Sequence, residues 1–175
     1  MITSPASAYC RSLLLGLLVL LGNGLAATAS AEESDKASAF ISAALSNSQQ
    51  QLARAQQGIR YGKTLAVRDQ AQGVLDQHGA LLRDLQTLAQ KKGAPAQSDA
   101  PLKPENSQAP LGASERFDHD YAVAQLQASK QAVTAFERMS KDDADTDLQG
   151  FARLWLPMLY HQRELADQLV ASQAP

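Results

Sequence analysis

One series of residues between positions 67 and 88 constrains the fold more than any other feature of the chain. It recurs every three or four positions and is apolar apart from one histidine: Val67, Ala71, Val74, His78, Leu81, Leu85 and Leu88. A spacing that alternates between four and three places all seven side chains on one side of an α-helix. The pattern therefore predicts a helix with one buried face, which other elements must cover.

The segment before this series also predicts helix. No proline occurs between Pro5 and Pro95, and residues 35–61 are rich in Ala, Gln, Leu and Arg, which are good helix formers. Ser34 or Asp35 would cap this first helix. Its apolar positions include Phe40, Ile41, Ala44, Leu45, Leu52 and Ile59.

The boundaries of the second helix have local signals. Gly58 and Gly62 weaken helical structure around residues 58–63, and Thr64 then suits the N-cap position. Gly93, directly after two lysines, is typical of a helix C-terminus. The second helix is thus predicted over residues 65–91.

Two further helices are predicted over residues 115–141 and 145–172, separated by an acidic turn. Acidic residues at the start of a helix are favoured by its dipole, and the ligand spacing of a calcium-binding EF-hand is absent. The third helix has apolar positions at Phe117, Tyr121, Ala124, Ala128, Ala132, Ala135 and Met139. On the fourth, the buried face is predicted to contain Leu148, Phe151, Trp155, Met158, Leu165 and Leu169, with a kink at Pro157.

A proline-rich linker, residues 93–114, separates the two pairs of helices. A helix of about 27 residues is roughly 40 Å long, and a linker of about two dozen residues can span that length. Bundles with one such crossover are the ferritin-like type. The predicted fold is therefore all-α: a ferritin-like four-helix bundle of two helical hairpins, forming a single domain over residues 32–175.

The N-terminal 31 residues have the composition of a secretory signal peptide. Arg11 precedes nine consecutive apolar residues, Leu13 to Leu21, and small residues follow as far as Ala31. The apolar run is too short for a transmembrane helix. Cleavage between Ala31 and Glu32 would remove Cys10, and the protein is expected to be periplasmic or secreted.

The expected mature chain of 144 residues excludes several classes of function. It has no cysteine, so disulfides and thiolate chemistry are excluded. Loss of Arg11 leaves 15 of the 16 basic residues against 18 acidic ones, a net charge of −3, without a basic stripe. Nucleic acid is therefore not an expected partner. No later segment could span a membrane, and the oligomeric state stays open.

Three short stretches resemble a known family: Phe117-Asp118-x-x-Tyr121, Phe136-Glu137 and Leu156-Pro157-x-x-x-His161. The chain resembles exported bacterial proteins catalogued as domain of unknown function 4142, often labelled outer membrane proteins. The resemblance implies export and a ferritin-like helical bundle, and it implies no reaction. It also implies an acidic residue where this chain has Gln51, Asp-His at Gln77-His78, and a histidine at Ser129.

A metal site inside the bundle is the most specific alternative function. Di-iron bundles use Glu-x-x-His on two helices, but Leu75 and Met158 stand three residues before His78 and His161. A di-iron site is therefore not expected. If both histidines face the interior, they and Glu164 could hold zinc or copper. Simple core-edge histidines are the competing interpretation.

The chain also lacks the sequence signals of an enzyme. No phosphate-binding glycine loop, nucleophile elbow or paired-carboxylate motif is present. The function predicted from sequence is a non-enzymatic periplasmic module that binds a protein or a small ligand, with no cofactor. A helix face, the linker or a pocket near Pro157 would carry that binding. The alternatives are a metal-binding or redox protein and an envelope stress or structural protein.

Overall fold

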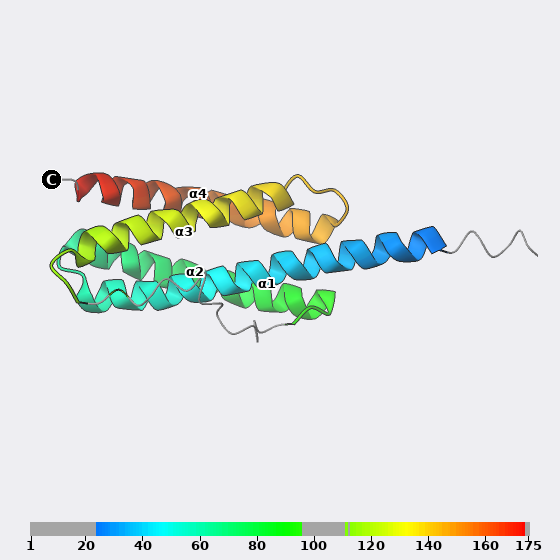
Figure 1. Ribbon diagram of the computed structural model, residues 1–175, viewed down its shortest axis with the longest axis horizontal. Helices are drawn as coiled ribbons and strands as arrows, with labels where there is room; N and C mark the ends of the chain where they lie inside the picture. Colours follow the sequence, from blue (N-terminus) through cyan, green and yellow to red (C-terminus); the bar gives the residue numbers. More distant parts are fainter. Residues whose placement is uncertain (1–23, 96–110, 112, 174–175) are drawn as a thin grey trace, which may run out of the picture.

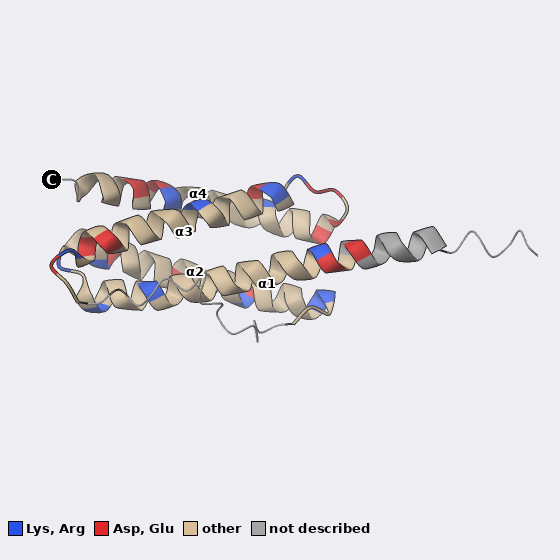
Figure 2. Cartoon of the chain, viewed as in Figure 1, with Lys and Arg blue, Asp and Glu red and all other residues tan. Residues whose placement is uncertain are grey.

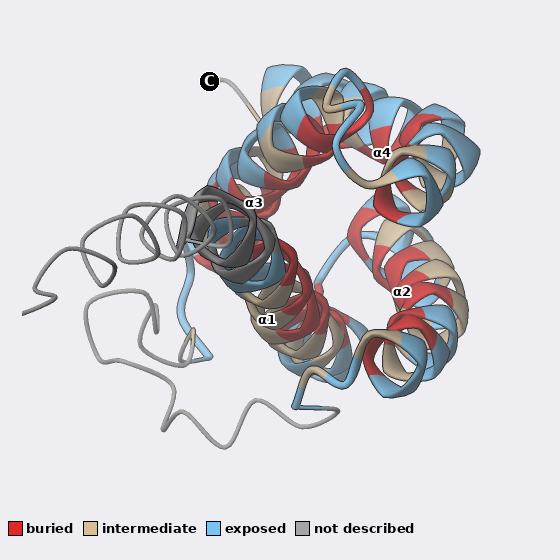
Figure 3. Cartoon of the chain, turned by 90° about the vertical axis from the view of Figure 1, so that its right-hand side faces the viewer, coloured by how far each residue is buried: buried red, intermediate tan, exposed pale blue. Residues whose placement is uncertain are grey.

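Four helices form the molecule in the computed structural model, which describes residues 24–95, 111 and 113–173. They are α1 (Gly24–Tyr61), α2 (Leu65–Lys92), α3 (Phe117–Met139) and α4 (Thr146–Ser172). Their buried faces point toward a common axis (Figure 3). The predicted all-α four-helix bundle is confirmed. The apolar run at Leu13–Leu21 and most of the proline-rich linker lie outside the described residues.

The helices are arranged as two antiparallel hairpins, α1 with α2 and α3 with α4 (Figure 1). Helix α2 ends beside the α3–α4 turn, whereas α3 begins beside the α1–α2 turn, at the other end of the bundle (Figure 1). The chain between Gly93 and Arg116 therefore connects opposite ends of the bundle. A helix of 28 residues such as α2 is roughly 42 Å long, so this connection has to be long.

Helix boundaries follow the predicted signals except at the start of α1. The Thr64 hydroxyl accepts from the Val67 N–H, and Gly93 ends α2 in the left-handed conformation at φ 63°. Asp145 caps α4 by accepting from two backbone N–H groups. The expectation that Ser34 or Asp35 caps α1 is wrong, because the helix already begins at Gly24. The alanines between residues 26 and 31 favour helix and extend it backward.

The predicted face of α4 is rotated relative to the observed one. The buried side chains on α4 are Leu148, Ala152, Leu156, Leu159, Gln162, Ala166 and Leu169. Phe151, Trp155 and Met158 are half-buried and flank the core, and Leu165 is exposed. Small side chains at Ala152 and Ala166 lie inside, while the larger aromatic rings lie at the edge. Pro157 is exposed, and α4 continues on both sides of it.

Gly58 allows α1 to approach two other helices closely. A Cβ atom at Gly58 would lie 2.7 Å from the Ala71 Cβ and 2.7 Å from Cε2 of Tyr121. At the opposite end of the bundle, the ring centroids of Phe40 and Phe136 are 5.2 Å apart. These two contacts fix the register between the antiparallel helices α1 and α3.

Candidate functional site

A layer of polar side chains divides the core in two. One apolar cluster includes Leu45, Leu85 and Phe136, and the other includes Val67 and Phe117 near the α1–α2 turn. Between them, all four helices contribute buried polar residues, here called the polar layer: Ser48, Gln51, Arg54, His78, Gln125, Ser129 and Gln162. Buried polar groups are costly unless they have partners, so the contacts of this layer decide what it does.

His78 is the centre of the paired part of the layer. Its Nε2 lies 2.8 Å from Oε1 of Gln162, and its Nδ1 lies 3.4 Å from the Ser48 hydroxyl. The Gln162 amide donates in turn to Oε1 of Gln77, so its oxygen faces the histidine. This assigns the proton to Nε2 and leaves Nδ1 to accept from Ser48. Burial, opposed in part by the hydrogen bond to Gln162 and assisted by the positive charge of Arg54, lowers the pKa of His78 to about 4, so His78 is neutral at pH 7.

The other part of the polar layer consists of residues of α1 and α3, and several of its polar atoms have no hydrogen-bond partner among the described residues. Arg54 donates to Oε1 of Gln51 over 3.2 Å, and burial lowers the pKa of its guanidinium below its usual range. Among the described residues, Nε2 of Gln51, both amide atoms of Gln125 and the Ser129 hydroxyl are buried without a hydrogen-bond partner. Counting from the contacts at either end of α1 and α3, Gln125 lies level with residues 51–54 of α1, whereas Ser129 lies level with residues 47–50.

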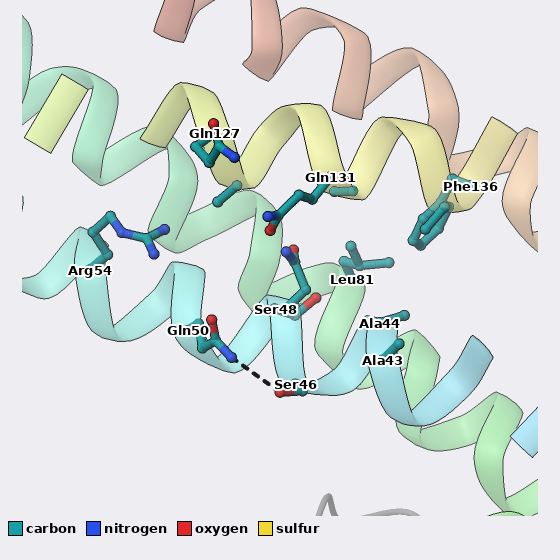
Figure 4. A pocket seen from close by; sticks show the side chains of 14 residues that line it. Ala43, Ala44, Ser46, Ser48, Gln50, Arg54, Leu81, Gln127, Gln131 and Phe136 are labelled. Atoms are coloured by element: carbon teal, nitrogen blue, oxygen red, sulfur yellow. Dashed lines mark hydrogen bonds between the residues drawn. The ribbon is translucent and has the colours of Figure 1, made fainter. Parts of the chain in front are cut away.

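Beside Ser48 and Arg54 of the polar layer, the bundle is hollowed between α1 and α3 (Figure 4). The hollow has a volume of about 400 Å³, and its floor reaches the fully buried Leu81 of α2. We call it the α1–α3 hollow; its lining residues are Ala43, Ala44, Ser46, Asn47, Ser48, Gln50, Arg54, Leu81, Gln127, Ala128, Gln131, Ala132, Ala135 and Phe136. The space exists because alanine and serine, rather than larger residues, face each other across the two helices.

The α1–α3 hollow has a polar end and an apolar end. Arg54 and the amides of Gln50 and Gln127 line one end, whereas Ala44, Phe136 and neighbouring alanines line the other (Figure 4). The surrounding sequence carries no acidic residue: residues 37–59 hold only the charge of Arg54, and residues 121–136 only that of Lys130. Most of both helices is accordingly uncharged in Figure 2.

The residues proposed for a metal differ in their exposure. His78 is fully buried, but His161 and Glu164 are exposed, so His161 does not meet the condition that both histidines face the interior. The neighbouring residue, Gln162, is the one that points inward and meets His78. Within the described residues, no group of three or more His, Cys, Asp or Glu side chains is placed to hold a metal ion. A metal site at His78, His161 and Glu164 stays a prediction.

The Phe117-Asp118-x-x-Tyr121 motif anchors one hairpin on the other. The Asp118 carboxylate accepts from the N–H groups of Lys63 and Thr64 and from the Thr64 hydroxyl, each at 2.8 Å. The Tyr121 hydroxyl donates to Oε1 of Gln70 at 2.8 Å. Asp118 and Tyr121 thus hold the α1–α2 turn and α2 against α3. From the far end of the linker, Leu111 donates its N–H to Gln57.

Sequence reasoning missed most of the polar layer and the whole hollow. Gln125 and Gln162 occupy inward positions of otherwise apolar helix faces, where a glutamine is uncommon. That irregularity was the available signal. The hollow itself depends on how α1 and α3 pair, which the sequence of either helix alone does not state. No lining residue of the α1–α3 hollow lies near Pro157, where the sequence analysis considered a pocket.

Comparison with known protein families identifies a match over most of the chain. A family model described as "Domain of unknown function (DUF4142)" matches residues 23–169, which cover most of the chain. No curated protein and no solved structure matches it. Within the described residues, no helix is long and apolar enough to cross a membrane.

Proposed function

The chain belongs to the DUF4142 family of domains of unknown function, and we propose that it is a non-enzymatic module that binds a small amphiphilic molecule in the α1–α3 hollow. One observation carries the proposal: a hollow of about 400 Å³ between α1 and α3 reaches from the surface to Leu81, a core residue of α2. Ligand sites in proteins fall between about 300 and 1,000 Å³ and combine apolar walls with a few polar groups.

The chemistry of the lining supports binding rather than catalysis. The polar groups are amides, hydroxyls and one guanidinium, which hold a ligand by hydrogen bonds and charge. General acid–base catalysis works best with a group that titrates near the working pH. His78, which contacts the lining residue Ser48, has both ring nitrogens engaged and a pKa of about 4. It therefore serves as a structural support for the wall of the hollow.

We further propose that the protein is exported to the periplasm and cleaved after Ala31. The support is the sequence of the first 31 residues, with one arginine, nine apolar residues and a small-residue site. Cleavage there would shorten α1 to residues 32–61 and leave every residue of the polar layer in place. Intact-mass analysis of the protein from a periplasmic extract should give a chain that begins at Glu32. Recovery of the uncleaved chain in the cytosol would contradict the proposal.

Filling the hollow should abolish binding of a neutral amphiphile. We take 1-octanol as the probe, because its hydroxyl can meet the amides while its chain lies on the alanines and Phe136. The double substitution Ala128→Leu with Ala132→Leu places two larger side chains inside the hollow. Saturation-transfer NMR should show octanol bound to the unsubstituted protein, with affinity at least about tenfold lower in the double variant.

A matched control separates occupancy of the hollow from added hydrophobicity. Ala53 is an exposed alanine of α1 outside the lining, so Ala53→Leu should leave octanol binding unchanged. Far-UV circular dichroism and the melting temperature verify that each variant is folded. Equal octanol affinity in all three proteins, or none in the unsubstituted one, would refute the hollow as the site.

A further inference from the structure

Three residues of the polar layer are buried with polar atoms that no described protein group satisfies. Gln51 and Gln125 are 0% exposed, and Ser129 is 2% exposed. Four of their side-chain atoms have no hydrogen-bond partner among the described residues: Nε2 of Gln51, Nε2 and Oε1 of Gln125, and the Ser129 hydroxyl. Burying an amide or a hydroxyl without a partner destabilises a fold. Four such atoms in one layer therefore indicate a bound species that supplies the hydrogen bonds.

The four atoms belong to neighbouring positions of α1 and α3. Gln125 and Ser129 are four residues apart, so their side chains lie on the same face of α3. Gln125 is level with residues 51–54 of α1 and Ser129 with residues 47–50, so Gln51 lies between them in level. Arg54 donates to the oxygen of the Gln51 amide at 3.2 Å. The nitrogen of that amide is therefore the atom that meets the bound species.

This cluster is separate from the α1–α3 hollow, because none of its three residues lines the hollow. The core residues one turn beyond Gln51 on α1 and beyond Gln162 on α4 are Ala55 and Ala166, both fully buried. These short side chains border the polar layer. A water molecule takes up about 30 Å³, which is far less than the volume of the hollow. The cluster thus suits an occupant as small as water and not the amphiphile proposed for the hollow.

The mixture of donors and acceptors selects the occupant. The nitrogens of Gln51 and Gln125 only donate, Oε1 of Gln125 only accepts, and the Ser129 hydroxyl does both. An anion cannot donate to the Gln125 oxygen, and a cation cannot accept from the two amides. Water donates and accepts, and a buried water typically makes about three hydrogen bonds. The oxygen and the nitrogen of one amide point in different directions, so Gln125 needs two waters.

We propose that the polar layer binds at least two ordered water molecules between Gln51, Gln125 and Ser129. One water accepts from the amides of Gln51 and Gln125, and the other donates to Oε1 of Gln125 and bonds to the Ser129 hydroxyl. The rest of the layer is already bonded in a chain across α1, α2 and α4. The waters extend this bonding to α3, whose two residues in the layer have no other partner among the described residues.

Nuclear Overhauser spectroscopy between water and the side-chain amides of the purified protein tests the proposal. The NH₂ groups of Gln51 and Gln125 should show cross-peaks to water with the sign of a long-lived contact. Gln125→Met replaces the amide by an apolar group of similar length and should remove the cross-peak at Gln51. Ser129→Ala should reduce both cross-peaks at least twofold. Gln56→Met is the matched control, because Gln56 is exposed on α1 outside the layer and the hollow, and it should leave both cross-peaks unchanged.

The melting temperature gives a second readout for Gln125→Met. If waters satisfy the amide, the substitution leaves them with fewer partners, and the melting temperature should fall. A rise would show that the amide is buried without water, because removing an unpaired polar group stabilises a core. That rise would overturn the proposal, as would observed NH₂ signals of Gln51 and Gln125 without water cross-peaks. Loss of the cross-peaks on addition of chloride would assign the site to an anion and also overturn it. If Gln125→Met does not fold, Ser129→Ala decides.

Discussion

Acidification from pH 7 to pH 4 should remove about 3 kcal/mol from the free energy of unfolding through His78 alone. The pKa of His78 is lowered by burial from 6.5 to about 4 in the folded protein. Between pH 6.5 and about pH 4, the unfolded chain binds a proton at His78 that the folded chain does not bind, so the free energy of unfolding falls as the pH falls. Each unit of difference between the folded and unfolded pKa values corresponds to about 1.36 kcal/mol. The contribution is fully present above about pH 6.5 and lost near pH 4.

Urea denaturation at pH 7, 5.5 and 4 measures this effect, with a His78→Gln variant for comparison. Glutamine can still donate to Gln162 and accept from Ser48, but it does not titrate. The variant should therefore lose about 3 kcal/mol less over the same range. His161→Gln is the matched control, because His161 is exposed and should leave the pH dependence unchanged. Parallel curves for the unsubstituted protein and His78→Gln would contradict the burial of a neutral imidazole.

Asp118→Ala should lower the free energy of unfolding by about 3 kcal/mol at pH 7. The carboxylate accepts three hydrogen bonds from Lys63 and Thr64. One bond to a charged group contributes about 1.5–3 kcal/mol, and bonds that share one carboxylate are not additive, so the expected loss lies at the upper end of the range for one bond. Burial raises the pKa of Asp118, but these three donors outweigh it and hold the pKa below its usual range. The stability that the Asp118 carboxylate contributes is therefore lost below about pH 4, which is lower than the pH range in which His78 changes the stability.

The half-exposed neighbour Asp120 provides the comparison for Asp118. Its ion pair with Arg116 is long, at 3.8 Å, and both side chains are accessible to water. Asp120→Ala should therefore change stability by less than about 1 kcal/mol. Asp118→Asn should fall between the two, because the amide retains one acceptor and loses the charge. Thermal and urea unfolding of the four proteins measure the order, and equal stability of Asp118→Ala and Asp120→Ala would refute the anchoring role.

The helices could be predicted because their signals are local. The seam from Val67 to Leu88 is buried at every position, and Thr64 and Gly93 end α2 as expected. Such features depend on spacing and on one capping residue, so one sequence suffices. The prediction of the buried face of α4 failed because that face does not depend on local signals alone. Helix α4 has apolar residues at adjacent positions, such as Phe151 and Ala152. Only the packing against the other three helices decides which of the two side chains is buried.

The polar layer and the hollow could not be predicted because they depend on pairs of helices. His78 was recognised as a core-edge residue or a metal ligand, but its partner turned out to be Gln162 and not His161. The α1–α3 hollow requires Ala44 and Ser48 to face Ala128 and Ala132. That juxtaposition follows from the register set by Gly58 against Tyr121 and by Phe40 against Phe136. No single segment of the sequence encodes this register.

Mapping of backbone amide chemical shifts during a titration with 1-octanol tests the central claim most directly. Binding in the α1–α3 hollow predicts that the largest shifts occur at residues 43–54 of α1 and 127–136 of α3, together with Leu81. The strongest competing surface is the exposed apolar side of α4, where Leu154 is 71% exposed and Leu165 is 36% exposed. Shifts centred on Leu154 and Leu165, or no shifts at saturating octanol, would contradict the account.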